Sequence, residues 1–214
     1  NLFPVLQSKR DDHNYVLMKR PDPDNRAEYY REVKETIDHL RHFVSIDTWV
    51  AFNEGWGQFD SQEVTDYIKK LDPERFVDSA SGWFDRGAGD FLSIHNYFRP
   101  LHLKKSQQII ILSEFGGMNY LIKNHFYGKK NYGYKQISSR RDFMIAYRKL
   151  MIRDIMKHIP DGLSGCIYTQ LSDIEDEVNG LITYDRQVIK CDQEIMRGIA
   201  QRIYALFERE VEHE

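Results

Sequence analysis

The sequence predicts an α/β fold in which helices cover a parallel β-sheet, and three observations support this fold class. Short, nearly continuous apolar runs alternate with amphipathic segments, which is the pattern of buried parallel strands joined by helical crossovers. Polar residues follow several of the apolar runs directly, and no glycine-rich phosphate loop follows any of them. The last two observations favour a closed barrel of the (β/α)8 type, with its chemistry at strand ends, over an open nucleotide-binding sheet.

Hydrophobic spacing sets the position of each expected element. Residues 1–7 are apolar enough for a strand remnant, and residues 8–25 carry mixed charge and two prolines, which is typical of a surface loop. The remaining expected elements are, in chain order, a helix at 26–41, a strand at 46–52, a helix at 60–70, strands at 75–80, 91–97 and 108–114, a helix at 139–158, a strand at 163–170 and a helix at 192–207.

Capping residues support the starts of two of these helices. Asp60, with Glu63 three positions later, predicts the start of the second helix, and Ser139 with Asp142 predicts the start of the third. We find no internal repeat and no low-complexity linker, so the simplest expectation is one domain over residues 1–214.

Composition excludes several classes of function. Hydrophobic residues make up 41% of the chain and charged residues 29%, and the formal net charge of -3 gives no general reason to bind nucleic acid or an anionic membrane. Cys166 and Cys191 form no CxxC pair, so neither a disulfide framework nor a zinc site is expected. No apolar run reaches membrane-spanning length and no signal peptide is recognisable, so we expect a soluble chain, cytoplasmic if it is complete.

Two glutamates follow apolar strands at the rim where a ligand can approach. Glu54 precedes Gly55, and Glu114 precedes an aromatic residue and two glycines. Either glutamate alone could cap a helix or pair with an arginine. Together, two carboxyl groups on strand ends of a small barrel can lie about 5 Å apart, the separation for a nucleophile and an acid/base in retaining glycoside hydrolysis. Tyr97 is a candidate hydrogen-bond donor to the nucleophile.

These residues carry a resemblance to glycoside hydrolase family 2, which includes β-galactosidases, β-glucuronidases and β-mannosidases. The resembling segments are residues 46–57 (IDTWVAFNEGWG), 112–117 (LSEFGG), 168–171 (YTQL), 177–181 (EVNGL) and 184–186 (YDR). The resemblance implies a barrel catalytic domain and retaining chemistry. Counted against that family, the chain contains about strands 3 to 8 of the barrel, so we expect a barrel truncated at its N-terminal side and a single portion of a longer enzyme.

The resemblance also implies roles for particular residues. Glu54 would be the acid/base, Glu114 the nucleophile, and Asn53 would hold the sugar 2-hydroxyl. Tyr97 lies on the strand that brings a tyrosine towards the nucleophile. His95, on the same strand, is either a substrate contact or a histidine satisfied by the protein at the rim.

Aromatic residues near the strand ends are candidate platforms for the sugar ring. Trp56 and Tyr168 are the best candidates, although the family often has tryptophan at the position of Tyr168. Trp49 lies within a strand and is expected in the core, and Trp83 could cover a helix end. The acidic loop at 173–177 lacks the spacing of a calcium loop and is expected to be a solvated edge, so neither a required metal nor a cofactor is predicted.

The function predicted from the sequence is that of a retaining exo-acting β-glycosidase, similar to a β-galactosidase or β-glucuronidase. The alternative is a noncatalytic carbohydrate-binding or interaction fragment that keeps the carboxylates but lacks the first strands. A truncated barrel would expose apolar strand edges, so the expected partners are the carbohydrate substrate and either the missing N-terminal domains or a second copy of the chain.

Overall fold

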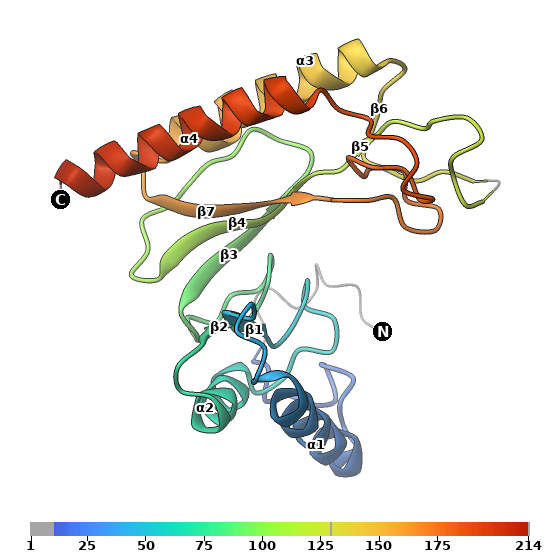
Figure 1. Cartoon of the computed structure of the whole chain (residues 1–214). Helices are drawn as coiled ribbons and strands as arrows, with labels where there is room; N and C mark the ends of the chain where they lie inside the picture. Colours follow the sequence, from blue (N-terminus) through green and yellow to red (C-terminus); the bar gives the residue numbers. More distant parts are fainter. Residues whose placement is uncertain (1–10, 129, 214) are drawn as a thin grey trace. The chain divides into compact units, whose positions relative to one another are not determined.

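The structure is a computed structural model that describes residues 11–128 and 130–213. The strand expected at residues 1–7 lies outside the described residues. Contacts divide the chain into two compact units. Of the described residues, unit one contains 11–95 and 106–111, and unit two contains 96–105, 112–128 and 130–213. Figure 1 labels the helices and strands of both units.

Unit one is built on a short parallel strand pair and two helices. Its elements are α1 (Pro23–Leu40), β1 (Thr48–Val50), α2 (Ser61–Leu71), β2 (Phe76–Asp78) and β3 (Phe91–Asn96), whose last residue belongs to unit two. Strands β1 and β2 pair in parallel, with Trp49 opposite Val77. The core joins the strands to both helices and contains Ile37, Trp49, Phe52, Phe59, Val64, Ile68 and Val77.

The start of each helix in unit one differs from the expectation. Helix α1 begins at Pro23 rather than at residue 26, because the Asp22 side chain accepts from the Asp24 backbone N–H at 2.9 Å and proline is favoured in the first helical turn. Asp60 was expected to cap α2 but makes no capping hydrogen bond. Instead, Asp12 Oδ2 accepts from the Ser61 backbone N–H at 3.0 Å.

Unit two contains two helices, and two of its strands are longer than β1 and β2 of unit one. Its elements are β4 (Ile109–Gly116, which begins in unit one), β5 (Met118–Asn119), β6 (Lys135–Gln136), α3 (Arg140–Leu150), β7 (Leu163–Thr169) and α4 (Gln193–His213). Strands β5 and β6 pair in parallel, and one three-stranded sheet has the order β3-β4-β7. Side chains from α3, β7 and α4 line one apolar pocket, so these three elements are neighbours (Figure 1).

The third expected helix, 139–158, is divided in the structure. Ser139 caps α3 as expected, since its Oγ accepts from the Asp142 N–H at 3.0 Å. After Leu150 the chain widens into a π-helical turn over Met151–Ile155 and then tightens into a 3-10 turn over Met156–His158. The π turn contains Asp154, which is fully buried and whose Oδ1 accepts from the Leu101 backbone N–H at 3.2 Å.

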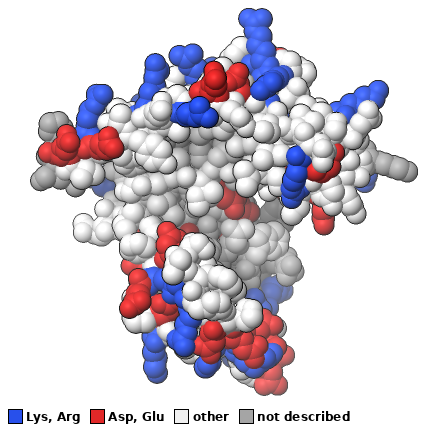
Figure 2. All heavy atoms as spheres, viewed as in Figure 1, with Lys and Arg blue, Asp and Glu red and all other residues white. Residues whose placement is uncertain are grey.

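The strands expected from the sequence at 46–52, 75–80, 91–97, 108–114 and 163–170 all form, although β1 and β2 are shorter than predicted. Within the described residues these strands form small separate sheets rather than one continuous sheet. No helix in the described ranges is long and apolar enough to cross a membrane. On the face seen in Figure 2, acidic and basic side chains are interspersed without a surface dominated by one sign.

Candidate active site

Glu54 lies where the parallel ladder of unit one ends. Two further backbone hydrogen bonds continue the ladder beyond β1 and β2. The Ser81 N–H donates to the Phe52 carbonyl at 2.8 Å, and the Glu54 N–H donates to the Ser81 carbonyl at 2.9 Å. Glu54 itself has a positive φ of 52° and is followed by Gly55 at φ 73°. The chain therefore turns sharply at the strand end, and the Glu54 side chain keeps 20% of its surface exposed.

The Glu54 carboxylate contacts His95 from β3. His95 Nδ1 lies 2.9 Å from Glu54 Oε1, and His95 Nε2 lies 3.1 Å from Ser81 Oγ. The imidazole has no exposed surface, and a Cβ on Gly82 would lie 2.3 Å from its ring, so glycine is needed at that position. Both ring nitrogens therefore have a hydrogen-bond partner within the protein. Of the two alternatives for His95, the structure shows a histidine with protein partners on both nitrogens.

Asp78, at the end of β2, adds a buried carboxyl group to the same region of unit one. Asp78 is 2% exposed, and this burial raises its pKa, while hydrogen bonds from Ser93 and Ser81 and the nearby His95 lower it in part. The Ser81 hydroxyl therefore connects Asp78 to His95, and through it to Glu54. Sequence reasoning missed Asp78 and Ser81. An aspartate inside the apolar run 75–80 is the signal that could have identified the first of them.

Glu114 lies near the end of β4 in unit two, where Tyr97 contacts it. The Tyr97 hydroxyl donates to Glu114 Oε2 at 2.6 Å, and Thr169 Oγ1 lies 3.1 Å from the same hydroxyl oxygen. This hydrogen bond is the one that the sequence predicted. Burial and then the bond to Glu114 raise the pKa of Tyr97, so its hydroxyl stays protonated and remains a donor at neutral pH.

The Tyr97 ring is held by an aromatic stack. It packs against Tyr134 with ring centroids 3.9 Å apart and an interplanar angle of 11°. Gly117 has a φ of 59°, and a Cβ there would lie 2.3 Å from the Tyr134 ring and 3.0 Å from the Tyr97 ring. The second glycine after Glu114 therefore gives the stack its space. Tyr134 was missed because it lies in a segment without hydrophobic periodicity, and no sequence signal marks it.

Tyr168 lies near the end of β7, beside Gly116. A Cβ on Gly116 would lie 2.4 Å from the Tyr168 ring, and Phe115 and Tyr147 meet the ring edge-on at 5.6 and 5.4 Å. Burial raises the pKa of the Tyr168 hydroxyl, and a backbone hydrogen bond from Met118 lowers it in part. The ring thus has protein neighbours on several sides. The Thr169–Gln170 peptide bond that follows is cis.

Asn53 and the three tryptophans differ in their exposure. Asn53 is exposed, and its backbone forms a parallel bridge with Ser81. Trp56 is 49% exposed. The prediction that Trp49 belongs to the core is confirmed, since it is 9% exposed and its Nε1 donates to Asp72 Oδ2 at 3.0 Å. Trp83 is 39% exposed and meets Phe84 edge-on.

The acidic loop after β7, at residues 173–177, makes more polar contacts within the protein than expected. The prediction of a solvated edge is wrong for Asp173, which is 1% exposed and lies 2.6 Å from the ammonium group of the buried Lys190. Gln170 Nε2 donates to Asn179 Oδ1 at 2.7 Å, and to Glu177 Oε2 at 3.2 Å. A buried ion pair and an amide network therefore hold the loop to the end of β7.

The predicted site residues thus occur in two groups. Unit one carries Asn53, Glu54, Trp56 and His95, and unit two carries Tyr97, Glu114 and Tyr168. Hydrogen bonds join Glu54 to His95 in the first group and Tyr97 to Glu114 in the second. The partner of Glu54 is therefore on strand β3, and the partner of Glu114 is the residue that directly follows this strand.

Comparison with known proteins finds similar folds at low sequence identity. No protein-family model matches the chain, and no curated protein matches it. Among solved structures, the β-glucuronidase of Faecalibacterium prausnitzii is similar with a TM-score of 0.56 and 15% identity over 84% of this chain. The β-D-glucuronidase of Dictyoglomus thermophilum has a TM-score of 0.55 and 14% identity over 92% of this chain. A GH2 β-galacturonidase of Eisenbergiella tayi, bound to galacturonate, has a TM-score of 0.51 and 15% identity over 78% of this chain.

The similar structures are much longer than this chain. The matched part is 35%, 38% and 36% of the three proteins, in the order given above. At these identities the likeness concerns the fold alone. The chain therefore has a fold similar to part of these β-glucuronidase and β-galacturonidase structures, one of which is described as a member of glycoside hydrolase family 2.

Proposed function

We propose that the chain is the later part of the catalytic barrel of a retaining exo-acting β-glycosidase, with Glu114 as nucleophile and Glu54 as acid/base. The observation that carries the proposal is the 2.6 Å hydrogen bond from the Tyr97 hydroxyl to Glu114, at the end of a strand in a fold like that of known glycosidases. In this mechanism the two carboxyl groups lie roughly 5 Å apart on either side of the anomeric carbon.

Glu114 needs to be an oriented, ionised carboxylate in order to attack the anomeric carbon. The Tyr97 donor stabilises negative charge on Oε2, and the stack on Tyr134 fixes the direction of the donor. Attack forms a covalent glycosyl–Glu114 ester as the leaving oxygen departs. When water later displaces the sugar, Glu114 leaves as a carboxylate, and Tyr97 again donates to it.

Glu54 has to give a proton to the leaving oxygen and then take one from water. Its contact with the buried His95 ring orients the carboxyl group, and Ser81 fixes the ring from the other side. His95 is thus proposed as a positioning residue. Around this chemistry, Asn53 would hold the sugar 2-hydroxyl, and Trp56 and Tyr168 would contact the apolar faces of the ring.

Because the chain spans little more than a third of the similar structures, we propose that further barrel strands and domains, or a second copy of the chain, complete the sugar site. Exposed apolar side chains on strands support such a partner: Val50 of β1 is 56% exposed, Phe76 of β2 is 45% exposed and Ile167 of β7 is 62% exposed.

The acid/base assignment is tested with Glu54→Gln on a panel of nitrophenyl glycosides that includes galactosides and glucuronides. Nitrophenolate needs little protonation to leave, so the glycosyl-enzyme forms but lacks the general base for its hydrolysis, and turnover should fall by at least about a hundredfold. Azide should restore turnover and yield a β-glycosyl azide, because azide needs no general base. Glu74→Gln, which removes an exposed carboxylate from the same unit, is the matched control and should keep full activity. No hydrolysis by the wild-type chain would instead favour a noncatalytic carbohydrate-binding fragment. Full activity in Glu54→Gln would refute the assignment.

A further inference from the structure

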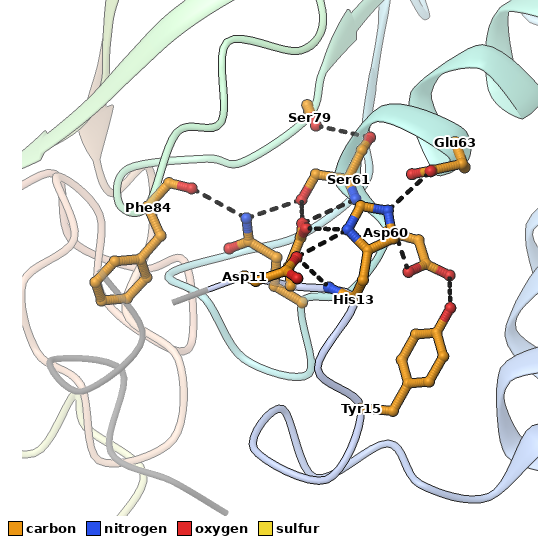
Figure 3. A network of polar contacts seen from close by, with 10 residues as sticks. Asp11, His13, Tyr15, Asp60, Ser61, Glu63, Ser79 and Phe84 are labelled. Carbon is orange, nitrogen blue, oxygen red and sulfur yellow. Dashed lines mark hydrogen bonds and ion pairs between the residues drawn. The ribbon is translucent and has the colours of Figure 1, made fainter. Parts of the chain in front are cut away.

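A second cluster of ionisable side chains lies in unit one, where the segment after residue 10 packs against the start of α2. Figure 3 shows His13 between the carboxylates of Asp11, Asp60 and Glu63. The segment is anchored by Asp12, which is 7% exposed and whose Oδ2 accepts from the Ser61 N–H at 3.0 Å and from the Ser61 hydroxyl at 2.6 Å. The cluster is therefore built on a defined backbone contact.

The two nitrogens of the His13 ring face different carboxylates. Nδ1 lies 2.9 Å from Asp11 Oδ1 and 3.5 Å from Asp12 Oδ1. Nε2 lies 2.9 Å from Glu63 Oε1 and 4.0 Å from Asp60 Oδ1. Each ring nitrogen therefore donates to a carboxylate. A metal ion would replace the proton on Nε2, while Asp11 goes on accepting from Nδ1–H and orients the ring, as in many metal-binding histidines.

Asp60 supplies an independent indication of a ligand. The residue is 9% exposed, and its Oδ2 accepts from the Tyr15 hydroxyl at 3.0 Å. Its Oδ1 is buried, points towards His13 Nε2, and has no hydrogen-bond partner among the described residues (Figure 3). A buried carboxylate oxygen without a hydrogen bond is costly, and a cation between Oδ1 and Nε2 would satisfy it.

The spacing of the three facing atoms suits a metal ion. His13, Asp60 and Glu63 each offer one ligand atom, and these three atoms lie within 4.8 Å of one another. Tetrahedral coordination with bonds of about 2.1 Å places neighbouring ligand atoms about 3.4 Å apart. The 2.9 and 4.0 Å separations lie on either side of that value, so small side-chain rotations would bring the atoms into place.

We propose that His13, Asp60 and Glu63 bind a divalent transition-metal ion of the zinc class, with Asp11 as the acceptor that orients the histidine. One imidazole nitrogen with two carboxylate oxygens is a ligand set that zinc accepts, and the fourth position is available to water. Four carboxylates surround the His13 ring, so the cluster attracts a cation. Bound metal would fasten the segment at residues 11–15 to α2 and stabilise unit one.

The inference does not depend on the proposed glycosidase function, because none of these residues belongs to the proposed sugar chemistry. The whole chain is made metal-free by dialysis against EDTA and then titrated with zinc chloride by isothermal calorimetry. Cobalt(II) serves as a second probe, because its visible absorption bands report bound nitrogen and oxygen ligands. We expect one saturable site per chain for both metals, and a rise in the unfolding temperature when zinc is added.

Variants identify the ligands. His13→Gln and Glu63→Gln should each weaken zinc binding by more than about a hundredfold, and Asp11→Asn should weaken it by about 10- to 100-fold. Glu63 is on the exposed side of α2, so its variant should keep the fold, as circular dichroism can verify. His125→Gln is the matched control, since His125 also lies 2.8 Å from a carboxylate, that of Asp185, but outside the cluster. Unchanged binding in His13→Gln, or no saturable site in the wild-type chain, would overturn the proposal.

Discussion

The replacement of Tyr97 by Phe tests the proposed role of the tyrosine most sharply. The substitution keeps the ring and its stack on Tyr134 but removes the hydroxyl that donates to Glu114 at 2.6 Å. A hydrogen bond to a charged group contributes about 1.5–3 kcal/mol. Because about 1.4 kcal/mol corresponds to a tenfold change in rate, complete loss of this bond at a transition state would slow that step by about 10- to 150-fold.

The two steps of the reaction should not slow equally. In the first step Glu114 loses negative charge as it attacks, so the Tyr97 bond weakens on the way to the transition state and contributes little to its rate. In the second step Glu114 regains that charge as it leaves, so loss of the donor should slow deglycosylation. In Tyr97→Phe we therefore expect kcat to fall by about tenfold or more, kcat/KM to change much less, and the glycosyl-enzyme to accumulate.

Steady-state and stopped-flow measurements with nitrophenyl glycosides check this difference. Tyr97→Phe should show a burst of nitrophenolate that matches the enzyme concentration. Tyr204→Phe, which removes an exposed hydroxyl on α4, should behave as the wild-type chain. If kcat of Tyr97→Phe stays within twofold of the wild type, or if kcat/KM alone falls, the reasoning about the Tyr97 donor is refuted.

Three further predictions concern unit two. Lys190→Met should lower the free energy of unfolding by about 3–5 kcal/mol in urea titrations, because it leaves the buried Asp173 carboxylate without its cation, and a loss below about 1 kcal/mol would contradict this. Ser139→Ala should cost about 1 kcal/mol in the same assay, since it removes the cap of α3, whereas Ser139→Asp should keep most of the stability. Burial raises the pKa of Cys166 to about 11, so at pH 8 only about one thiol in a thousand is ionised, and iodoacetamide should label Cys166 slowly until urea unfolds the chain or the pH approaches 11. Rapid labelling of the folded chain at pH 8 would contradict that expectation.

Much of the secondary structure could be predicted because buried strands and amphipathic helices leave a local record in the sequence. The apolar runs at 46–52 and 108–114 became β1 and β4, and Ser139 capped α3. The expectations failed where contacts between residues far apart in the sequence determine the local structure. Asp60 looks like a helix cap, but its left-handed backbone and its bond to Tyr15 remove it from that role, and Asp12, 49 positions away from Ser61, takes its place.

The candidate site was predictable to the extent that it depends on strand ends. Tyr97 was expected to donate to Glu114 because the resemblance to glycoside hydrolase family 2 implies a tyrosine near the nucleophile, and the hydrogen bond is present. The partners of these residues were not predictable in the same way. Tyr134 comes from a segment without periodicity, and the role of Ser81 depends on how the buried His95 ring is oriented.

Covalent labelling of Glu114 tests the central claim, which is that this carboxylate is the nucleophile of a retaining glycosidase. The chain is incubated with 2-deoxy-2-fluoro-β-galactosyl and 2-deoxy-2-fluoro-β-glucuronosyl fluorides, which form a slowly hydrolysed ester with a nucleophilic carboxylate, and its peptides are then analysed by mass spectrometry. The account predicts one fluorosugar per chain on the peptide that contains Glu114, and none in Glu114→Gln. An unlabelled wild-type chain, or a label on another carboxylate, would contradict it.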